Sequence, residues 1–260
     1  MEDIVCVILA AGRGKRMQQG QKTQQKVLVK IQEKPMLGHV LEVIAAVGIK
    51  RVIVVVGHQG EQVEEYLKEW RHTFLLETVK QKDLLGTADA VRQTEGLLKN
   101  YHGDILILYG DTPLLTEKTL RRLLEEHRIR ENYCTLVTTL LQDPTGYGRI
   151  VRNGRSETVE KIVEEVDTTP TEKAIREINV GVYCFKAESL FEAVRAVRPN
   201  NRKNEYYLTD TIAILSKKKQ VVGSVVSKDR HEVLGVNSPI DLTKARNALD
   251  TYKDSTEATP

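Results

Sequence analysis

A segment rich in glycine and small residues follows the first apolar run of the 260-residue chain. It reads Leu-Ala-Ala-Gly-Arg-Gly-Lys-Arg-Met over residues 9–17. Glycines and small residues let a backbone approach a ligand closely, and successive N–H groups in such a turn can surround an anion. Arg13, Lys15 and Arg16 add positive charge. The segment therefore predicts a phosphate-binding turn, and a triphosphate is the ligand we expect there.

Two other phosphate-binding motifs fit this segment poorly. A P-loop needs Gly, four residues and then Gly-Lys-Ser/Thr, which is absent. The dinucleotide-binding fingerprint needs a third Gly or Ala where Met17 stands, and an acid where the second strand ends at Val56-Gly57-His58. An oxidoreductase is therefore a weak alternative.

Apolar runs alternate with amphipathic ones along the first half of the chain. Strands are predicted, from their apolar and β-branched residues, at Ile4–Leu9, Arg51–Val56, Phe74–Val79, Asp104–Tyr109 and Cys134–Leu141. Helices are predicted at Met36–Val47, Glu61–Trp70, Ala88–Leu98 and, capped by Thr116, to about Arg128. This alternation predicts an α/β fold with a mostly parallel sheet covered by helices on both faces. Ligands of such sheets bind beyond the carboxyl ends of the strands.

The second half of the chain has a different pattern. It predicts a hairpin over Arg149–Ile162 with a turn at Asn153-Gly154, and strands at Ile175–Phe185 and Gln220–Val226. Helices are expected at Tyr206–Lys217 and from Ser238-Pro239 to about Leu249. We interpret this half as an insertion lobe followed by a return to the sheet, and Asp254–Pro260 as a frayed tail.

The composition excludes several classes of protein. A net charge of +3 without a basic stripe among aromatics gives no support for nucleic-acid binding. Cys6, Cys134 and Cys184 form neither a disulfide framework nor a zinc pattern, and as buried thiols they suit a reducing compartment. The run Ile4–Ala11 is too short to span a membrane and follows acidic residues. We therefore expect a soluble cytoplasmic protein with no membrane or nucleic-acid partner.

Residues 9–17 resemble the signature of the sugar nucleotidyltransferases, and further segments resemble this family in the same order. They are Lys26-Val27-Leu28, Gln81, Leu85-Gly86-Thr87, Tyr109-Gly110-Asp111, Asp143–Ile150, Glu177–Gly181, Glu205–Asp210 and Gly235-Val236-Asn237. Several are similar to segments of the branch that uridylylates N-acetylglucosamine 1-phosphate. The resemblance runs from about residue 4 to residue 250.

The resemblance implies a Rossmann-like, glycosyltransferase-A-like fold, a sugar-binding insertion lobe and the substrates UTP and a sugar 1-phosphate. It implies phosphate contacts by Arg16 and Lys26, and magnesium held by Asp111 and Asn237. The implied nucleotide contacts are Leu9, Ala10, Ala11, Gly12, Gly14, Gln81, Gly86 and Thr87. The implied sugar contacts are Gly148, Glu164, Asn179 and Tyr207. Residues 1–250 would form the transferase domain, with residues 1–112 mainly binding nucleotide, residues 113–250 mainly binding sugar, and residues 251–260 as a flexible tail.

Aspects of these assignments can also be argued from the residues themselves. Aspartate and asparagine oxygens are hard ligands that suit Mg²⁺. A glutamine amide offers both the donor and the acceptor that an imide edge requires. Tyr207 could equally be a packing residue, and Glu165 is adjacent to Glu164 and easily confused with it. All six histidines are expected to be surface or packing residues.

The sequence departs from the family at two places near the nucleotide. Gln25 stands where a proline usually precedes the lysine, and the loop before it is about three residues longer, so Lys22 competes with Lys26 for the phosphate role. Leu84 stands where the branch often has glutamine. The alternatives are another nucleotide or sugar phosphate, or a sugar-nucleotide sensor without catalysis. The bifunctional members continue into a hexapeptide-repeat acetyltransferase; no such repeat occurs here, so acetyl transfer is not expected.

Overall fold

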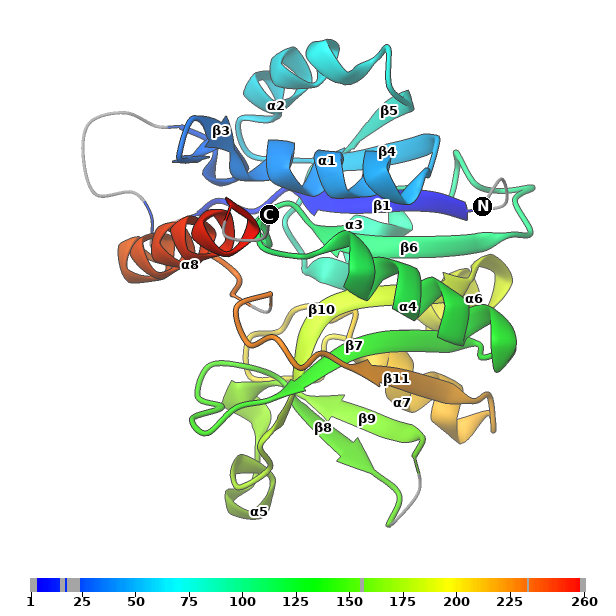
Figure 1. The fold of residues 1–260 in the computed structure, drawn as a ribbon. Helices are drawn as coiled ribbons and strands as arrows, with labels where there is room; N and C mark the ends of the chain where they lie inside the picture. The colour runs from blue at the N-terminus through cyan, green and yellow to red at the C-terminus, as the bar shows by residue number, and fades with distance from the viewer. Residues whose placement is uncertain (1–3, 15–16, 18–23, 155–156, 233, 258–260) are drawn as a thin grey trace.

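The computed structural model describes residues 4–257 apart from 15–16, 18–23, 155–156 and 233, with side chains to residue 251. In this part of the chain nine strands form one sheet in the order β11-β7-β10-β6-β1-β4-β5, with β8 and β9 joined at β10 (Figure 1). The strands are β1 (Ile4–Ala10), β4 (Arg51–Val56), β5 (Leu75–Lys80), β6 (Asp104–Tyr109), β7 (Cys134–Leu140), β8 (Arg149–Arg152), β9 (Val159–Val163), β10 (Glu177–Lys186) and β11 (Val222–Val226). A separate small ribbon pairs β2 (Lys30–Ile31) with β3 (Lys34–Pro35).

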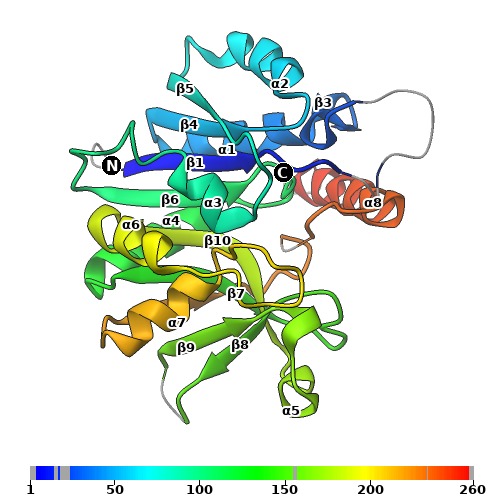
Figure 2. The same ribbon diagram turned by 180° about the vertical axis from the view of Figure 1, so that it is seen from behind.

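Helices cover both faces of the sheet. On one face lie α1 and α4; α3, α6 and α7 cover the other, as Figure 2 shows from behind. The α-helices are α1 (Met36–Val47), α2 (Gly60–Leu67), α3 (Thr87–Arg92), α4 (Glu117–Ile129), α5 (Pro170–Lys173), α6 (Ala187–Ala196), α7 (Asp210–Lys217) and α8 (Pro239–Glu257). Short 3₁₀ turns are η1 (Lys26–Leu28), η2 (Lys68–Trp70) and η3 (Glu165–Asp167).

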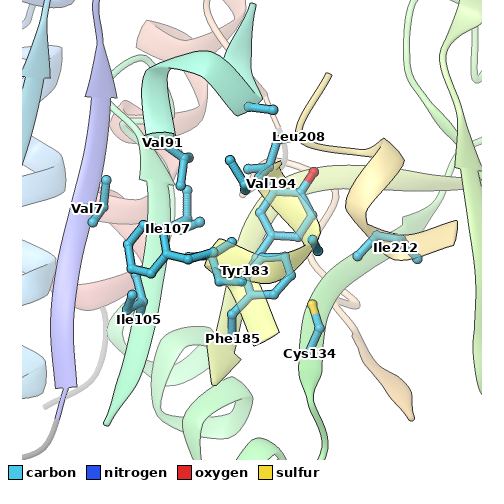
Figure 3. Close-up of a cluster of buried hydrophobic side chains, with 14 of the residues drawn as sticks. Val7, Val91, Ile105, Ile107, Cys134, Tyr183, Phe185, Val194, Leu208 and Ile212 are labelled. Carbon is cyan, nitrogen blue, oxygen red and sulfur yellow. The ribbon is translucent and has the colours of Figure 1, made fainter. Parts of the chain in front are cut away.

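The central strands β1, β4 and β6 are almost entirely apolar because both of their sides are buried, whereas the edge strand β5 is partly exposed and carries polar residues. In β1, Val5 and Val7 pack into one core cluster while Cys6 and Ile8 pack into the other. The first cluster, drawn in Figure 3, joins β6 and β10 to α3, α6 and α7. Such two-sided burial is what continuous apolar strands indicate. The prediction of a mostly parallel sheet between helical layers is confirmed.

Strand β10 departs from the parallel order. It runs antiparallel to both β6 and β7, between which it lies. Its register against β7 shifts between Asn179 and Tyr183, where Gly181 has φ of 88°. This bulge follows from a glycine in a left-handed conformation that other residues rarely adopt. The second half of the chain thus returns to the sheet at its centre, by β10, and at its edge, by β11.

Many predicted elements have the predicted bounds, including Met36–Val47, Arg51–Val56 and Asp104–Tyr109. Thr116 caps α4 by accepting a hydrogen bond from the Thr119 amide, as predicted. Ser238 also caps its helix, since its hydroxyl oxygen accepts from the Asp241 amide at 3.2 Å. The three cysteines are free and buried, which confirms that prediction.

Other predicted bounds are wrong, and non-local contacts explain the largest error. Helix α7 begins at Asp210 rather than Tyr206, because the backbone of Tyr206 donates to Leu85 O at 2.7 Å and accepts from Ala88 N at 2.9 Å. Helix α3 ends at Arg92 rather than Leu98, and the chain continues in turns.

Two further differences concern helices in the second half. Helix α6 was absent from the prediction, although Leu190, Phe191 and Val194 bury one side of it. Helix α8 continues past the expected end at Leu249 to Glu257, so the tail expected from residue 251 begins as helix. None of the helices that the structure describes has the length and hydropathy needed to cross a bilayer.

Candidate active site

A cavity of about 340 Å³ opens beyond the carboxyl ends of β1, β5 and β6. Every residue that the sequence assigns to the nucleotide lines it: Leu9, Ala10, Ala11, Gly12, Gly14, Gln81, Gly86 and Thr87. Lys26, Asp111 and Asn237 line it too. Residues distant in the sequence thus meet at the sheet edge where ligands of such folds bind.

Glycine is required at one position of the turn that follows β1. Gly14 has φ of 61°, and a Cβ atom built there would lie 2.8 Å from the Cβ of Lys26. Both the left-handed conformation and this close approach exclude larger residues. Gly14 therefore brings the turn directly against the segment that carries Lys26. Arg16 and the alternative phosphate ligand Lys22 lie outside the described residues.

Gln25 connects the glycine-rich turn to the lysine segment. Its side chain is 2% exposed, and its Nε2 donates to Ala10 O at 3.0 Å and Gly12 O at 3.1 Å. Its Oε1 accepts from the Val27 amide at 2.8 Å, and its own backbone N–H donates to Gln62 Oε1 at 3.0 Å. A proline, usual for the family here, could make none of these four bonds. The departure from the family pattern was the one sequence signal that could have identified this residue.

We expect Gln25→Ala to raise the KM for the nucleotide about tenfold. The substitution leaves Ala10 O, Gly12 O and the Val27 N–H without their side-chain partner, and each unsatisfied buried group costs roughly 1–3 kcal/mol of free energy. Steady-state kinetics would measure this, with thermal unfolding to separate loss of fold from loss of position. Gln24→Ala is the matched control, because among the described residues the Gln24 side chain makes one hydrogen bond, to Leu28 O at 2.9 Å. Equal KM values for Gln25→Ala and Gln24→Ala would mean that the hydrogen bonds of Gln25 do not position the glycine-rich turn for the nucleotide.

The ammonium group of Lys26 lies between Asp111 and Asn237. It forms an ion pair with Asp111 Oδ2 and donates to Asn237 Oδ1 at 2.8 Å. The side chains of Lys26 and Asp111 are 11% and 19% exposed, so the pair is only partly screened by water. Asp111 lies two residues after the end of β6, and its carbonyl accepts from the Val236 amide at 2.9 Å, which aligns the segment before α8 with it.

The two oxygens that meet at Lys26 fit the metal predicted from the sequence. One ammonium contacts both, so Asp111 Oδ2 and Asn237 Oδ1 are close enough to share one cation. A carboxylate and an amide oxygen are hard donors, and Mg²⁺ typically takes one or two such protein ligands and completes its shell with water and phosphate. The donor set is therefore suitable for Mg²⁺, and Lys26 would have to leave this position for the ion to bind.

A second cavity, of about 280 Å³, adjoins the first. Three of the four residues assigned to the sugar line it: Gly148, Glu164 and Asn179. It shares Tyr109, Asp111 and Asn237 with the nucleotide cavity. The predicted nucleotide and sugar residues therefore face two compartments that meet at the predicted metal ligands.

Asn179 is held by the bulge of β10. Its Oδ1 accepts from the Gly181 amide at 3.1 Å, and its Nδ2 donates to the hydroxyl of Tyr183 at 2.6 Å. Its backbone amide donates to Gly148 O at 2.9 Å, so the hairpin and the bulge fix one another. The register shift of β10 between Asn179 and Tyr183 thus lies where Asn179 lines the second cavity.

Glu164 and Glu165, which the sequence left hard to distinguish, have different surroundings. Glu164 lines the second cavity and accepts from the hydroxyl of Thr209 at 2.9 Å. Burial raises the pKa of the Glu164 carboxyl above its ordinary value. Glu165 is paired instead with Arg149 at 2.6 Å. Of the two, Glu164 is in the lining of the second cavity, and its contact with a sugar stays a prediction.

Tyr207 is not brought into either cavity lining. It is 7% exposed, and its hydroxyl has no hydrogen-bond partner among the residues that the structure describes. This placement is that of a packing residue, so a contact between Tyr207 and a sugar stays a prediction.

Asp210 should make the stability of the fold depend on pH. Burial, with Glu164 and Asp167 nearby, raises its pKa from 3.8 to about 6. The folded state therefore binds more protons than the unfolded state between about pH 4 and pH 6, and stability decreases as pH rises through that window. We expect Asp210→Asn to raise Tm at pH 7.5 and to have little effect at pH 4. Calorimetry at both values would test this, with the exposed Glu188→Gln as a control; an equal effect at both would contradict it.

The architecture and the two joined cavities are those expected of a nucleotidyltransferase. Residues 5–241 match the model of the Nucleotidyl transferase family, and the chain belongs to that family. It is 42% identical over 245 residues to the bifunctional protein GlmU of Acetivibrio thermocellus, covering 94% of this chain and 51% of that one. With its counterpart from Pelotomaculum thermopropionicum the identity is 41% over 247 residues, 95% and 52% of the two chains. The chain thus spans about half the length of the curated relatives it matches.

Solved structures agree on the fold. A UDP-glucose pyrophosphorylase in complex with UDP-glucose superposes with a TM-score of 0.78 at 20% identity, covering 97% of this chain and all of the other. A glucose-1-phosphate thymidylyltransferase from Bacillus anthracis, solved with sucrose, gives 0.76 at 17% identity and covers 94% of each chain. At these identities the similarity establishes the fold alone.

Proposed function

We propose that this protein transfers a uridylyl group from UTP to N-acetylglucosamine 1-phosphate and releases pyrophosphate. The observation that carries the proposal is the junction of two cavities at Asp111 and Asn237, each lined by the residues assigned to one substrate. The membership of the nucleotidyl transferase family supports the reaction class. The motif resemblance to the N-acetylglucosamine branch supports the choice of sugar.

The reaction needs positioning and charge neutralisation rather than a general base. A phosphate monoester has a second pKa of about 6, so the sugar phosphate is mainly dianionic at neutral pH and is itself the nucleophile. The glycine-rich turn would hold the triphosphate by backbone amides, and Lys26, once moved from Asp111, would neutralise developing charge. Holding the sugar phosphate in line with the phosphate that it attacks further lowers the activation barrier. We expect no covalent intermediate.

Mg²⁺ is part of this proposal. Asp111 and Asn237 would hold it, and the bound ion would supply charge neutralisation where the two substrates meet. Three buried free thiols suit a reducing compartment, so we place the activity in the cytoplasm.

The decisive experiment is a pyrophosphate-release assay with Mg²⁺, in which UTP, dTTP, CTP and GTP are each paired with N-acetylglucosamine 1-phosphate and glucose 1-phosphate. We expect the highest kcat/KM for UTP with N-acetylglucosamine 1-phosphate. A preference for another pair would keep the reaction class and change the substrates. Binding of UDP-sugars with no release from any pair would favour a sensor over an enzyme.

A further inference from the structure

The amide of Gln81 is held in one orientation by the protein. Its Nε2 donates to Gly86 O at 3.0 Å and to Asp89 Oδ2 at 2.8 Å. An amide nitrogen carries two protons, and both are donated to acceptors that cannot themselves donate. The opposite assignment of oxygen and nitrogen would place three acceptor oxygens against one another. Gln81 can therefore present only its oxygen to a ligand.

Gln81 is part of the lining of the nucleotide cavity. Gln81 is 4% exposed, it lines the cavity, and in the described part of the chain its Oε1 accepts no hydrogen bond. Leu84, where the branch often has a second glutamine, lines the same cavity and offers no polar group. Residues 81 and 84 together therefore offer a base one polar side-chain atom, the oxygen of Gln81, which accepts hydrogen bonds.

Asp89 and the Gly86 carbonyl fix this orientation together, and Asp89 is the side chain of the two. It is 6% exposed within α3, and its other carboxylate oxygen accepts from Gln93 Nε2 at 3.4 Å. A carboxylate accepts and never donates while ionised, so it cannot adapt to a reversed Gln81 amide. An ordinary acid in the first turn of a helix would be explained by the helix dipole alone. The bond to Gln81 is an additional contact that the dipole does not explain.

We propose that Asp89 is a specificity-determining residue, which locks Gln81 as a hydrogen-bond acceptor and so selects bases with an imide N–H. Uracil and thymine carry a proton at N3, whereas cytosine has a lone pair there that would face the Gln81 oxygen. An unmatched pair of acceptors in a buried site is disfavoured strongly enough to exclude the wrong base. This inference rests on the proposed function, because it assumes that Gln81 contacts the base.

The test compares binding of UTP, dTTP and CTP by calorimetry, in the unaltered protein and in Asp89→Asn. In the unaltered protein we expect CTP to bind at least about tenfold more weakly than UTP. In Asp89→Asn the new amide can donate as well as accept, so that only Gly86 O still opposes a reversed Gln81 amide, and we expect the UTP-to-CTP affinity ratio to fall by about fivefold. Asp83→Asn is the matched control, since it removes an exposed charge from the same segment and should keep the ratio.

The outcomes separate this inference from the function on which it rests. CTP binding as well as or better than UTP in the unaltered protein would overturn it and would place Gln81 opposite the 4-amino group instead. If the UTP-to-CTP affinity ratio of Asp89→Asn stayed within twofold of the unaltered value, Asp89 would be only an acid in the first turn of α3, with no part in the choice of base. In both cases nucleotide binding and the reaction class of the proposed function would remain, although better binding of CTP would change the nucleotide proposed for it. If no nucleoside triphosphate bound at all, both proposals would fail. The comparison in the unaltered protein needs no variant to fold.

Discussion

Asp111→Ala is expected to lower pyrophosphate release by about 10³-fold or more, because it removes the only charged donor proposed for the Mg²⁺ ion that neutralises the transferring phosphates. Stability should change little. Asp111 lies in a turn after β6, and Lys26, left without this partner, keeps its hydrogen bond to Asn237 Oδ1 at 2.8 Å. Steady-state release of pyrophosphate and a thermal melt would measure the two effects side by side.

Binding of Mn²⁺, followed by its electron paramagnetic resonance signal, gives a readout independent of turnover. Asp111→Ala should weaken Mn²⁺ binding in the presence of UTP, and Asn237→Ala should weaken it less, since an amide carries no net charge. Asp83→Ala, an exposed acid outside the shared lining, is the control. Near-normal pyrophosphate release by Asp111→Ala would remove Asp111 from the metal site and leave only its ion pair with Lys26.

The parts of this fold that the sequence predicts well are those with local causes. The 12-residue helix α1 ends where Gly48 takes φ of 90°, and α4 starts where Thr116 caps it. The placement of Asp111 at the ligand-binding edge of the sheet follows from one rule: ligands of such sheets bind beyond the carboxyl ends of the parallel strands. In these cases a few residues that are neighbours in the sequence determine the local structure.

The parts that the sequence predicts poorly depend on distant partners. Helix α7 starts late because Tyr206 exchanges backbone hydrogen bonds with the segment after Gln81. The position of β10 between β6 and β7 cannot be read from its apolar pattern, which would suit any buried strand. Gln25 and Asp89 are ordinary polar residues in the sequence, and only their bonds to the turn and to Gln81 reveal what they position.

The ion pair at the junction of the two cavities bears on which lysine, Lys22 or Lys26, contacts the phosphates. The structure places Lys26 in both the nucleotide cavity and the predicted metal position. One ammonium cannot stay between Asp111 and Asn237 while Mg²⁺ binds the same oxygens. If Asp111 and Asn237 hold the proposed Mg²⁺, Lys26 would exchange its partners when the substrates bind, from protein oxygens to phosphate oxygens.

This exchange gives Lys26→Met two opposite expected effects. Turnover should fall by about 10²–10³-fold, the typical cost of removing one donor from a charge-stabilising site. Without nucleotide, however, Mn²⁺ should bind about tenfold more tightly than to the unaltered protein, because the competing cation is gone and hydrogen bonds to charged groups contribute roughly 1.5–3 kcal/mol. With UTP present the advantage should disappear, since the unaltered lysine then pairs with phosphate.

Lys22→Met is the matched control for this experiment, as it removes the alternative lysine. It should leave Mn²⁺ binding without nucleotide unchanged. A large loss of turnover in Lys22→Met and none in Lys26→Met would transfer the phosphate role to Lys22. Weaker or equal Mn²⁺ binding by Lys26→Met without nucleotide would mean that the ammonium does not compete for the Asp111 and Asn237 oxygens, and Lys26 would then act only on the phosphates.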